Sequence, residues 1–396
     1  MTFRELLYII IPISEDWLKI AVQIAEKLPD FQKHYRSAGM RGFWYMNNIT
    51  LKSIKCESIK SIFASIADAD KISRAEISAK TDLSLVTVGK VADALLDMNI
   101  VCQVKEIKPQ AGRRAGLLGV NPDKFAVILD ITSYDFRVSV LNLRLHQIEK
   151  YVYNGPHNAS YEECLNSFFC DTSIYIGRKY NFDNCFGVGV SCPGPYNEVQ
   201  DSVTTTRVPE LRGLKLKEML CRHFRNLPLL IDSHINAAAR SNVLHVDQYD
   251  EKNIVYWYVG TRNVCGAFMV KGEIILGRDH LACEFGKMID RSGISLEEKI
   301  AAAKEATDFA DVLAQPMYSI IKILSPHTII IECDIPHTYD EILPLLKEKM
   351  THDYNYNEAE FPEFYKACCK FRNSHRGLTM GLRDMWIDKL VFGNNC

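Results

Sequence analysis

Residues 72–101 read ISRAEISAKTDLSLVTVGKVADALLDMNIV and carry the signals of two short helices joined by a tight turn. Ser73 and Glu76 form a Ser-x-x-Glu capping box, which begins a helix by satisfying backbone donors that otherwise have no acceptor. We expect Ile72 and Ile77 to pack across this cap as a hydrophobic staple.

A second helix is predicted after a turn at residues 81–83, with Ser84 as its cap. Apolar residues recur at helical spacing and predict its buried face: Val88, Val91, Ala92, Leu95 and Leu96. The residues left on the outward face are Leu85, Val86, Thr87 and Lys90. This pattern predicts a helix-turn-helix, whose second helix lies in the DNA major groove. We expect Arg74, Ser84 and the four outward residues to contact DNA, and an ordinary helical hairpin is the alternative.

The segment after the second helix predicts a wing. Residues 101–104, VCQV, are extended, and residues 105–116 form a polar loop that ends in QAGRRAG. Gly112 lets the backbone approach a partner closely, while Arg113 and Arg114 fit a minor groove or clamp phosphates. A surface linker is the alternative interpretation of this loop.

Length and charge indicate at least two parts. The chain has 396 residues and a net charge of −2, and residues 41–115 hold 12 Lys or Arg against 8 Asp or Glu, which leaves −6 elsewhere. A basic module on an acidic body favours salt-dependent DNA binding. We expect an extension of uncertain role at 1–39, a winged helix-turn-helix domain at 40–120 and an effector and dimerisation domain at 121–396. Met40 is an alternative start.

Cysteine usage and hydropathy favour a cytoplasmic location. The 13 cysteines form no Cys-x-x-Cys pair, and the sequence shows neither a signal peptide nor an apolar run long enough for a membrane span. We expect most cysteines to be small core residues.

From Phe125 onward, apolar strands alternate with helices, which predicts an α/β domain. The expected strands cover residues 126–130, 137–143, 186–190, 229–231, 254–259, 267–270, 273–275 and 327–331, with helices from Ala237 and over residues 310–324.

Several of these segments together resemble the repressor, open reading frame, kinase (ROK) family. The resemblance extends from about residue 40 to 390 and rests on the order of the helix-turn-helix, Gly112-Arg113-Arg114, the strand-end Asp130, GVGVSCPGP from Gly187, DSHINAAA from Asp232 and EFGKM from Glu284. It implies an actin-like or hexokinase-like fold with two α/β halves. Family members with an N-terminal winged helix are sugar-responsive transcriptional regulators, and those without it are usually sugar kinases.

The resemblance also implies that kinase chemistry is lost. The family's catalytic Asp falls at His234, although a histidine can itself accept a proton. The first phosphate loop, normally rich in glycine, holds side chains at residues 130–134, and the second, at residues 260–266, keeps only part of its glycine pattern. The late Gly-Gly on the nucleoside side is Glu332-Cys333. We expect no enzyme activity and no cofactor.

The family's zinc site has also changed. Family members carry a Glu-x-Gly-His motif and a cysteine-rich run that supply one His and three Cys ligands. Here the matching residues are Glu284 to Lys287 and a cysteine-free segment at 290–294, so no structural zinc is expected.

Four residues match the family's sugar-binding positions: His234, Asn236, Glu284 and Lys287. Glu210 stands near the usual Asn position. Such a pocket suits a modified or acidic sugar. The alternative is a structural remnant in which Glu284 pairs with Lys287.

The leading hypothesis is a homodimeric or homotetrameric repressor of carbohydrate metabolism that binds a double-stranded DNA operator and responds to a sugar or sugar derivative. The alternatives are an ATP-dependent sugar kinase with a DNA-binding domain and a DNA-binding regulator that needs no ligand. Neither the effector nor the operator sequence follows from the residues.

Overall fold

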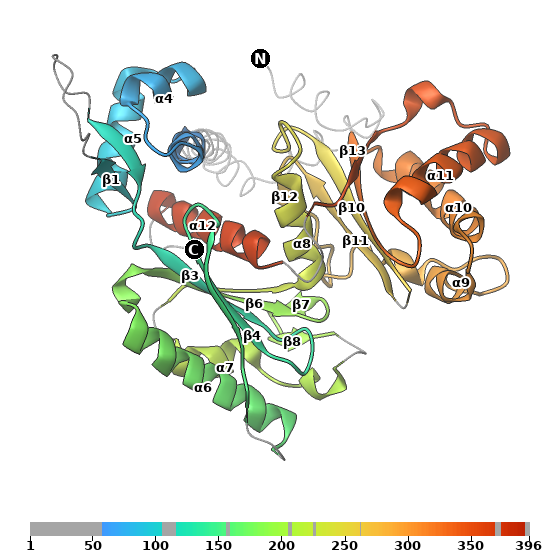
Figure 1. Cartoon of the computed structure of the whole chain (residues 1–396), viewed down its shortest axis with the longest axis horizontal. Helices are drawn as coiled ribbons and strands as arrows, with labels where there is room; N and C mark the ends of the chain where they lie inside the picture. Colours follow the sequence, from blue (N-terminus) through green and yellow to red (C-terminus); the bar gives the residue numbers. More distant parts are fainter. Residues whose placement is uncertain are drawn as a thin grey trace, which may run out of the picture. The chain divides into compact units, whose positions relative to one another are not determined.

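The computed structural model describes residues 58–104, 116–155, 159–204, 208–224, 227–261, 263–368 and 374–392, without the side chains of 388–392. Residues 62–388 form one compact unit. Figure 1 shows the α/β architecture, with two five-stranded sheets and their covering helices. The α/β class predicted from the sequence is confirmed.

The first part of the described chain is helical and ends in a strand pair. Residues 58–68 are helical, and α4 (Arg74–Thr81) and α5 (Leu85–Asp97) follow. Strand β1 (Val101–Val104) then pairs antiparallel with β2 (Leu117–Val120). We call residues 58–104 and 116–120 the N-terminal module. Its core is a small set of buried apolar side chains: Ile62, Phe63, Ile66, Ile72, Ile77, Val88, Ala92, Leu95, Ile100 and Leu118.

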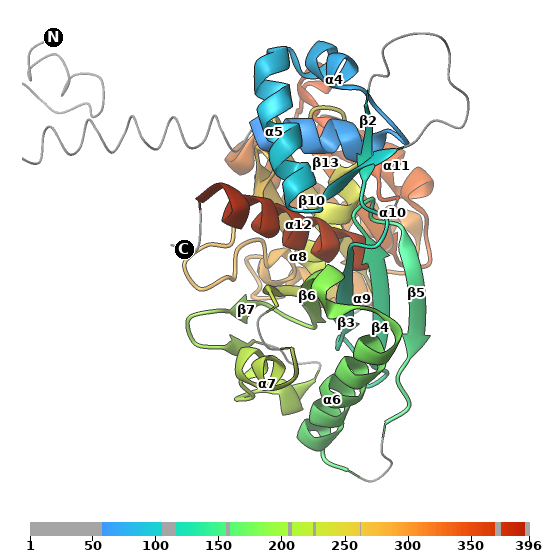
Figure 2. The ribbon, with the colours of Figure 1, turned by 90° about the vertical axis from the view of Figure 1, so that its left-hand side faces the viewer.

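The first sheet has the strand order β5-β4-β3-β6-β9. Its strands are β3 (Phe125–Asp130), β4 (Arg137–Asn142), β5 (Gln147–Val152), β6 (Cys185–Cys192) and β9 (Leu229–Ser233). The neighbouring short elements are η1 (Phe182–Asn184), β7 (Tyr196–Asn197), β8 (Ser202–Val203) and η2 (Pro209–Leu211). Helices α6 (Tyr161–Lys179) and α7 (Leu216–His223) cover one face, and α12 (His375–Phe392) lies on the other (Figures 1 and 2).

The second sheet has the strand order β12-β11-β10-β13-β14. Its strands are β10 (Asn253–Gly260), β11 (Asn263–Val270), β12 (Glu273–Ile274), β13 (Thr328–Asp334) and β14 (Glu363–Lys366). Alternate side chains of β10 enter two different cores, because neighbouring strand residues point to opposite faces. Val255 and Trp257 pack with the helices on one face, and Tyr256 and Tyr258 pack with α8 on the other. The helices and turns of this half are α8 (His234–Val243), η3 (Phe285–Lys287), α9 (Leu296–Ala302), α10 (Ala306–Leu324), α11 (Tyr339–Asp353) and η4 (Glu358–Glu360).

The structure contains helices that the sequence analysis did not predict, among them α6, α11 and α12, and it moves the ends of others. Helix α8 begins at His234, three residues before the expected start, because Ser233 caps it through the backbone N–H of Asn236 at 3.2 Å. Helix α10 begins at Ala306 because Glu305 and Asp308 form a capping box that the apolar pattern did not show. The expectation for the cysteines was wrong: of the ten in the described residues, only Cys185, Cys192 and Cys265 are buried, and all ten are free thiols.

No helix in the part of the chain that the structure describes has the length and apolarity needed to span a membrane.

Candidate functional site

Helices α4 and α5 begin at the predicted caps. The backbone N–H of Ser73 donates to Glu76 Oε2 at 2.8 Å, and that of Glu76 donates to Ser73 Oγ at 3.3 Å. Ser84 Oγ accepts the backbone N–H of Thr87 at 3.1 Å. The chain reverses at Asp82, whose φ of 55° ends α4 in the left-handed region. A reciprocal cap at the start of α4 and a single side-chain cap at the start of α5 therefore fix where the two helices begin.

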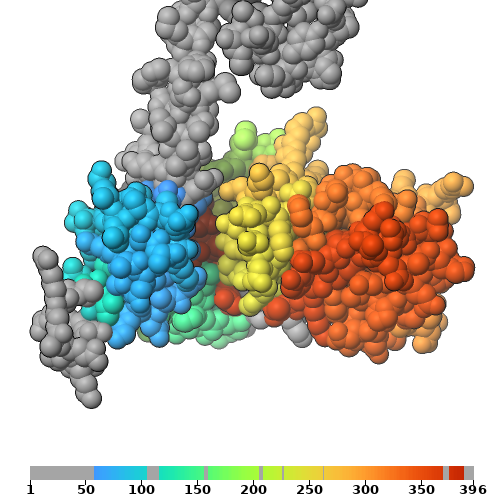
Figure 3. Space-filling model, turned by 90° about the horizontal axis from the view of Figure 1, so that it is seen from above, coloured from blue at the N-terminus to red at the C-terminus, as the bar shows by residue number. Residues whose placement is uncertain are grey.

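The predicted outward face of α5 is outward in the structure, with one exception. Leu85 and Val86 are 58% and 68% exposed, and Lys90 is exposed as well. Thr87 is half-buried, and its hydroxyl lies 2.9 Å from Ser84 Oγ. Figure 3 shows the surface of the N-terminal module in blue.

Arg74, which we expected to contact DNA, forms an ion pair with Asp93 of α5. The pair crosses from the first turn of α4 to the second half of α5, and it fixes the angle between the two helices. Both side chains remain partly exposed, so the pair contributes little to folding stability. Arg74 therefore has a structural role that the sequence did not indicate, whatever its part in DNA binding.

Strands β1 and β2 confirm the extended pair predicted after α5. Val101 pairs with Val120 and Val104 with Leu117. Gly112, Arg113 and Arg114 lie outside the described residues, so their role stays a prediction.

Side chains occupy the loop at the end of β3. Asp130 Oδ1 accepts hydrogen bonds from the backbone N–H of Thr132 at 3.0 Å and from its hydroxyl at 2.6 Å. The hydroxyl of Tyr134 donates to Glu210, with both carboxylate oxygens 3.0 Å away, and the ring of Tyr134 packs edge-on against Tyr161. Asp130 therefore bonds within this loop and Tyr134 bonds to Glu210 of η2, whereas a phosphate cradle presents open backbone amides.

Asp232 is the centre of a buried polar network at the start of α8. It is 8% exposed, forms an ion pair with Arg240 and accepts a hydrogen bond from Asn236 Nδ2 at 2.8 Å. The backbone N–H of Ser233 donates to the same carboxylate at 2.8 Å. The amide of Asn236, a predicted sugar contact, is thus held by Asp232. The spacing of four residues from Asp232 to Asn236 and on to Arg240 was a signal that sequence reasoning missed.

His234 replaces the carboxylate that a sugar kinase of the resembled family uses as its base. Its ring is 4% exposed, and Nδ1 lies 2.8 Å from the carbonyl oxygen of Cys192. A neutral imidazole must carry its proton on Nδ1 to make this hydrogen bond. The contact joins α8 to the end of β6, so His234 contributes to the first sheet's packing as well as to any ligand site.

Glu284 and Lys287 flank the turn η3, but they do not form the pair that we considered. Lys287 Nζ lies 2.6 Å from Glu297 Oε2 of α9, and this hydrogen bond raises the pKa of Lys287. Burial raises the pKa of Glu284, an effect that Lys287 opposes and Glu297 reinforces. The alternative of a Glu284–Lys287 surface pair is therefore wrong, because the partner comes from ten residues farther along the chain.

A second ion pair holds the segment where the resembled family carries its cysteine ligands. Lys299 Nζ lies 2.6 Å from Asp290 Oδ2, and this hydrogen bond lowers the pKa of Asp290 to about 2. Within the described residues, no three His, Cys, Asp or Glu side chains are grouped as a metal site.

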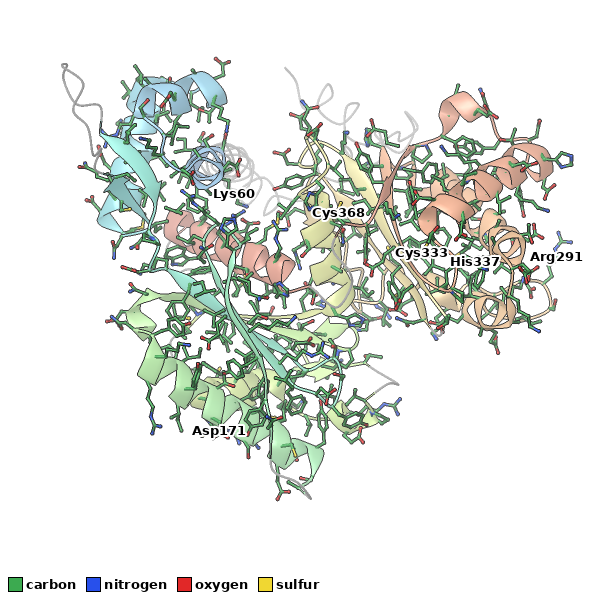
Figure 4. All side chains as sticks on the ribbon, viewed as in Figure 1. Lys60, Asp171, Arg291, Cys333, His337 and Cys368 are labelled. Carbon is green, nitrogen blue, oxygen red and sulfur yellow. The ribbon has the colours of Figure 1, made fainter. Side chains whose placement is uncertain are left out.

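Two acidic residues end β13 at the expected nucleoside side. Glu332 is 9% exposed and accepts a hydrogen bond from Tyr256 at 2.5 Å, while Asp334 accepts one from Tyr258 at 2.8 Å. Cys333 lies between them (Figure 4) and lines a small apolar cavity of about 10 Å³ with Trp257 and Leu346. Where the family resemblance expects Gly-Gly, the side chains of Glu332 and Cys333 therefore contact other protein side chains.

Comparison with known proteins identifies the second part of the chain. The ROK family profile matches residues 130–293. A curated protein of Caldicellulosiruptor sp. (strain Rt8B.4) named "Putative xylose repressor" is 27% identical over 235 residues, which span 57% of this chain and 57% of that relative.

Solved structures share the fold at low identity. A ROK family transcriptional regulator, described as a homolog of the E. coli MLC protein, has a TM-score of 0.67 at 15% identity and covers 85% of this chain and 99% of its own. A ROK family protein from Streptococcus pneumoniae TIGR4 in complex with sucrose has a TM-score of 0.52 at 17% identity, covering 66% of this chain and 99% of its own. A glucokinase from Parabacteroides distasonis ATCC 8503 has a TM-score of 0.55 at 13% identity, covering 67% of this chain and 98% of its own. Residues 130–293 of this chain therefore form a domain of the ROK family.

Proposed function

We propose that this protein is a sequence-specific DNA-binding transcriptional repressor of carbohydrate metabolism. One observation carries the proposal: the capped pair α4 and α5, followed by the β1–β2 pair, directly precedes a ROK family domain. Helix α5 is the recognition helix, and β1 and β2 form the wing. The names of a related repressor and of a structurally similar ROK regulator support this proposal.

The ROK domain acts as a sensor of a sugar or sugar derivative, without kinase activity. The buried carboxylate of Asp232 is paired with Arg240, so it is not arranged as the base for a sugar hydroxyl. Tyr134 and Glu210 close the first phosphate loop. Glu284 keeps a half-buried carboxyl group that suits a sugar hydroxyl, and we assign His234, Asn236 and Lys287 to the same site.

DNA binding is tested on operators selected from a random duplex pool with the full-length chain. Lys90→Ala should weaken binding several-fold and reduce the slope of log affinity against log salt by about 1, since one phosphate contact is lost. Lys304→Ala, at an exposed lysine outside the N-terminal module, is the matched control. If the selection recovers no preferred sequence, the proposed function is wrong. If the Lys90→Ala and Lys304→Ala variants bind equally well, only the role assigned to Lys90 is wrong.

Two further measurements on the same protein distinguish sugar sensing from sugar phosphorylation. A panel of neutral, acidic and amino sugars should include one that raises Tm, because a ligand that binds only the folded state stabilises it. An ATP-turnover assay with the same panel should give no turnover above the protein-free rate. Turnover would favour the alternative of a sugar kinase with a DNA-binding domain, and a flat Tm panel would favour a regulator without a ligand.

A homodimer suits this function, because two recognition helices then meet two half-sites about one helical turn apart. A sugar that binds one arrangement of the two halves of the ROK domain more tightly than the other would favour that arrangement. The distance between the two recognition helices would then change. The expected operator is therefore a near-palindrome, and a homotetramer would bind two such operators.

A further inference from the structure

Helix α5 begins with two large apolar side chains that face solvent. Leu85 is 58% exposed and Val86 68% exposed, although buried apolar residues are available on the opposite side of the same helix. Exposed Leu and Val side chains leave apolar surface in water and gain no packing contacts within the module. Two of them side by side therefore indicate a contact surface. Lys90 is exposed one turn farther along.

The polar groups nearest to these side chains are engaged within the protein. Ser84 Oγ caps the helix through the N–H of Thr87, and the two hydroxyls lie 2.9 Å apart. The guanidinium of Arg74 is paired with Asp93. Proteins distinguish guanine and adenine mainly by paired hydrogen bonds from Arg, Lys, Asn or Gln. The first turn of α5 offers methyl groups in place of such donors.

Gly89 supplies an independent observation. It lies inside α5, and a Cβ atom added there would meet no protein atom within 4 Å. A glycine inside a helix costs about 1 kcal/mol relative to alanine, and here no packing contact in the protein requires it. Spacings of three and four residues place Gly89 on the same side as Val86 and Leu85. A glycine at such a place suits a ligand that approaches the helix backbone closely.

We propose that Leu85 and Val86 recognise thymine through its C5-methyl group, and that Gly89 lets the backbone of α5 come close to the DNA. The major groove presents this methyl group only at thymine, and apolar side chains are the groups that contact it. This inference rests on the proposed function and specifies which base each half-site must contain.

Charge favours DNA over an apolar protein partner for this surface. The first turn of α5 has no acidic residue, and Lys90 follows it. The last turn of α4 adds the exposed Lys80. Cations on these two helices suit contacts to the phosphate backbone of DNA.

The decisive experiment replaces thymidine by deoxyuridine at single positions of a selected operator, which removes one methyl group and changes no hydrogen-bonding atom. We expect affinity to fall by about fourfold at each contacted position, the equivalent of one buried methyl group, and to stay unchanged elsewhere. If no position responds while the operator is still bound specifically, the thymine inference is wrong and the proposed function stands. If no operator can be selected, both are wrong.

Protein variants assign the contacts to residues. Val86→Ala and Leu85→Ala should each weaken binding to the operator that contains thymidine. Each variant should weaken binding much less when the thymidine that its side chain contacts is replaced by deoxyuridine. Both positions are exposed, and alanine favours a helix, so the variants fold. Val199→Ala, at a valine that is 95% exposed, is the matched control and should bind both operators normally. Equal losses on thymine and deoxyuridine operators would contradict methyl recognition.

The Gly89→Ala variant tests whether Gly89 is needed for the close approach of DNA or for the fold of the protein itself. The variant should raise Tm by about 2 °C, because it improves helix propensity in open space, and should lower operator affinity by about tenfold or more. A variant with unchanged operator affinity would show that the DNA does not approach the backbone at this residue. A lower Tm would show that Gly89 serves the fold itself.

Discussion

At the scale of single residues, Glu284 of the proposed sugar site shows how burial perturbs a carboxyl group. Its carboxyl group is half-buried between the buried Phe285 and solvent, and burial raises its pKa above the ordinary value of 4.5. A group with a raised folded-state pKa contributes stability that is fully present below its unfolded pKa and lost as pH rises through the folded value. Once pH has risen through its folded-state pKa, the ionised Glu284 is therefore unfavourable for folding, a cost that is typical of residues kept for a ligand.

Glu284→Gln tests this reasoning. The variant should have a higher Tm than the native protein at pH 7, and the difference should disappear on acidification below about 4.5, where Glu284 is protonated in both states. The same variant should lose the response of Tm to its sugar, since an amide cannot accept hydrogen bonds at both atoms. Glu251→Gln, at an exposed glutamate, is the control and should change neither property. A pH-independent difference in Tm would contradict the assigned cause.

At the scale of elements, the packing of α12 against α8 controls the position of His234 and Asn236. A Cβ atom at Gly377 would lie 1.9 Å from the carbonyl oxygen of Ala237, and the backbone N–H of Gly377 donates to Ser241 Oγ at 2.8 Å. The two helices can meet this closely only because residue 377 has no side chain. The sequence of α12 did not indicate this contact, because the partner is some 140 residues earlier in the chain.

Gly377→Ala should lower the free energy of unfolding by about 3 kcal/mol, since the backbone carbonyl cannot move aside as a flexible side chain does. Gly381→Ala is the matched comparison on the same helix. Its Cβ would meet the Leu230 side chain at 2.7 Å, which can rotate, so a smaller loss is expected. Urea denaturation midpoints of the two variants measure the difference. Equal losses would indicate that helix α12 shifts easily on α8.

At the scale of the whole molecule, Arg144 joins the N-terminal module to the first sheet. It lies in the turn between β4 and β5, and its Nη1 is 2.5 Å from Asp70 Oδ1. Nη2 donates to the carbonyl oxygens of Ala69 at 2.8 Å and Asp70 at 3.0 Å. Arg383 of α12 adds a cation–π contact with Phe63, 5.5 Å from the ring centre. We propose these contacts as the connection through which a sugar bound by the ROK domain would change the affinity for DNA.

Arg144→Ala should uncouple the two binding events. The factor by which the sugar changes operator affinity, and the equal factor by which the operator changes sugar affinity, should both approach 1. Operator affinity without sugar should change little. Arg222→Ala, which breaks an exposed ion pair on α7, should leave the coupling intact. Full coupling in the Arg144 variant would show that the signal passes through other contacts.

The sequence by itself determined local features: the caps at Ser73 and Ser84, three of the five residues predicted for the buried face of α5, and the end of β3 at Asp130. These depend on residues within one or two turns of each other, so their spacing along the chain is enough to predict them. Only the tertiary structure decided the partners of the charged groups, such as Glu297 for Lys287, Arg240 for Asp232 and Asp70 for Arg144. Which opposite charge lies within reach depends on which segments the fold brings together, and spacing along the chain does not contain that information.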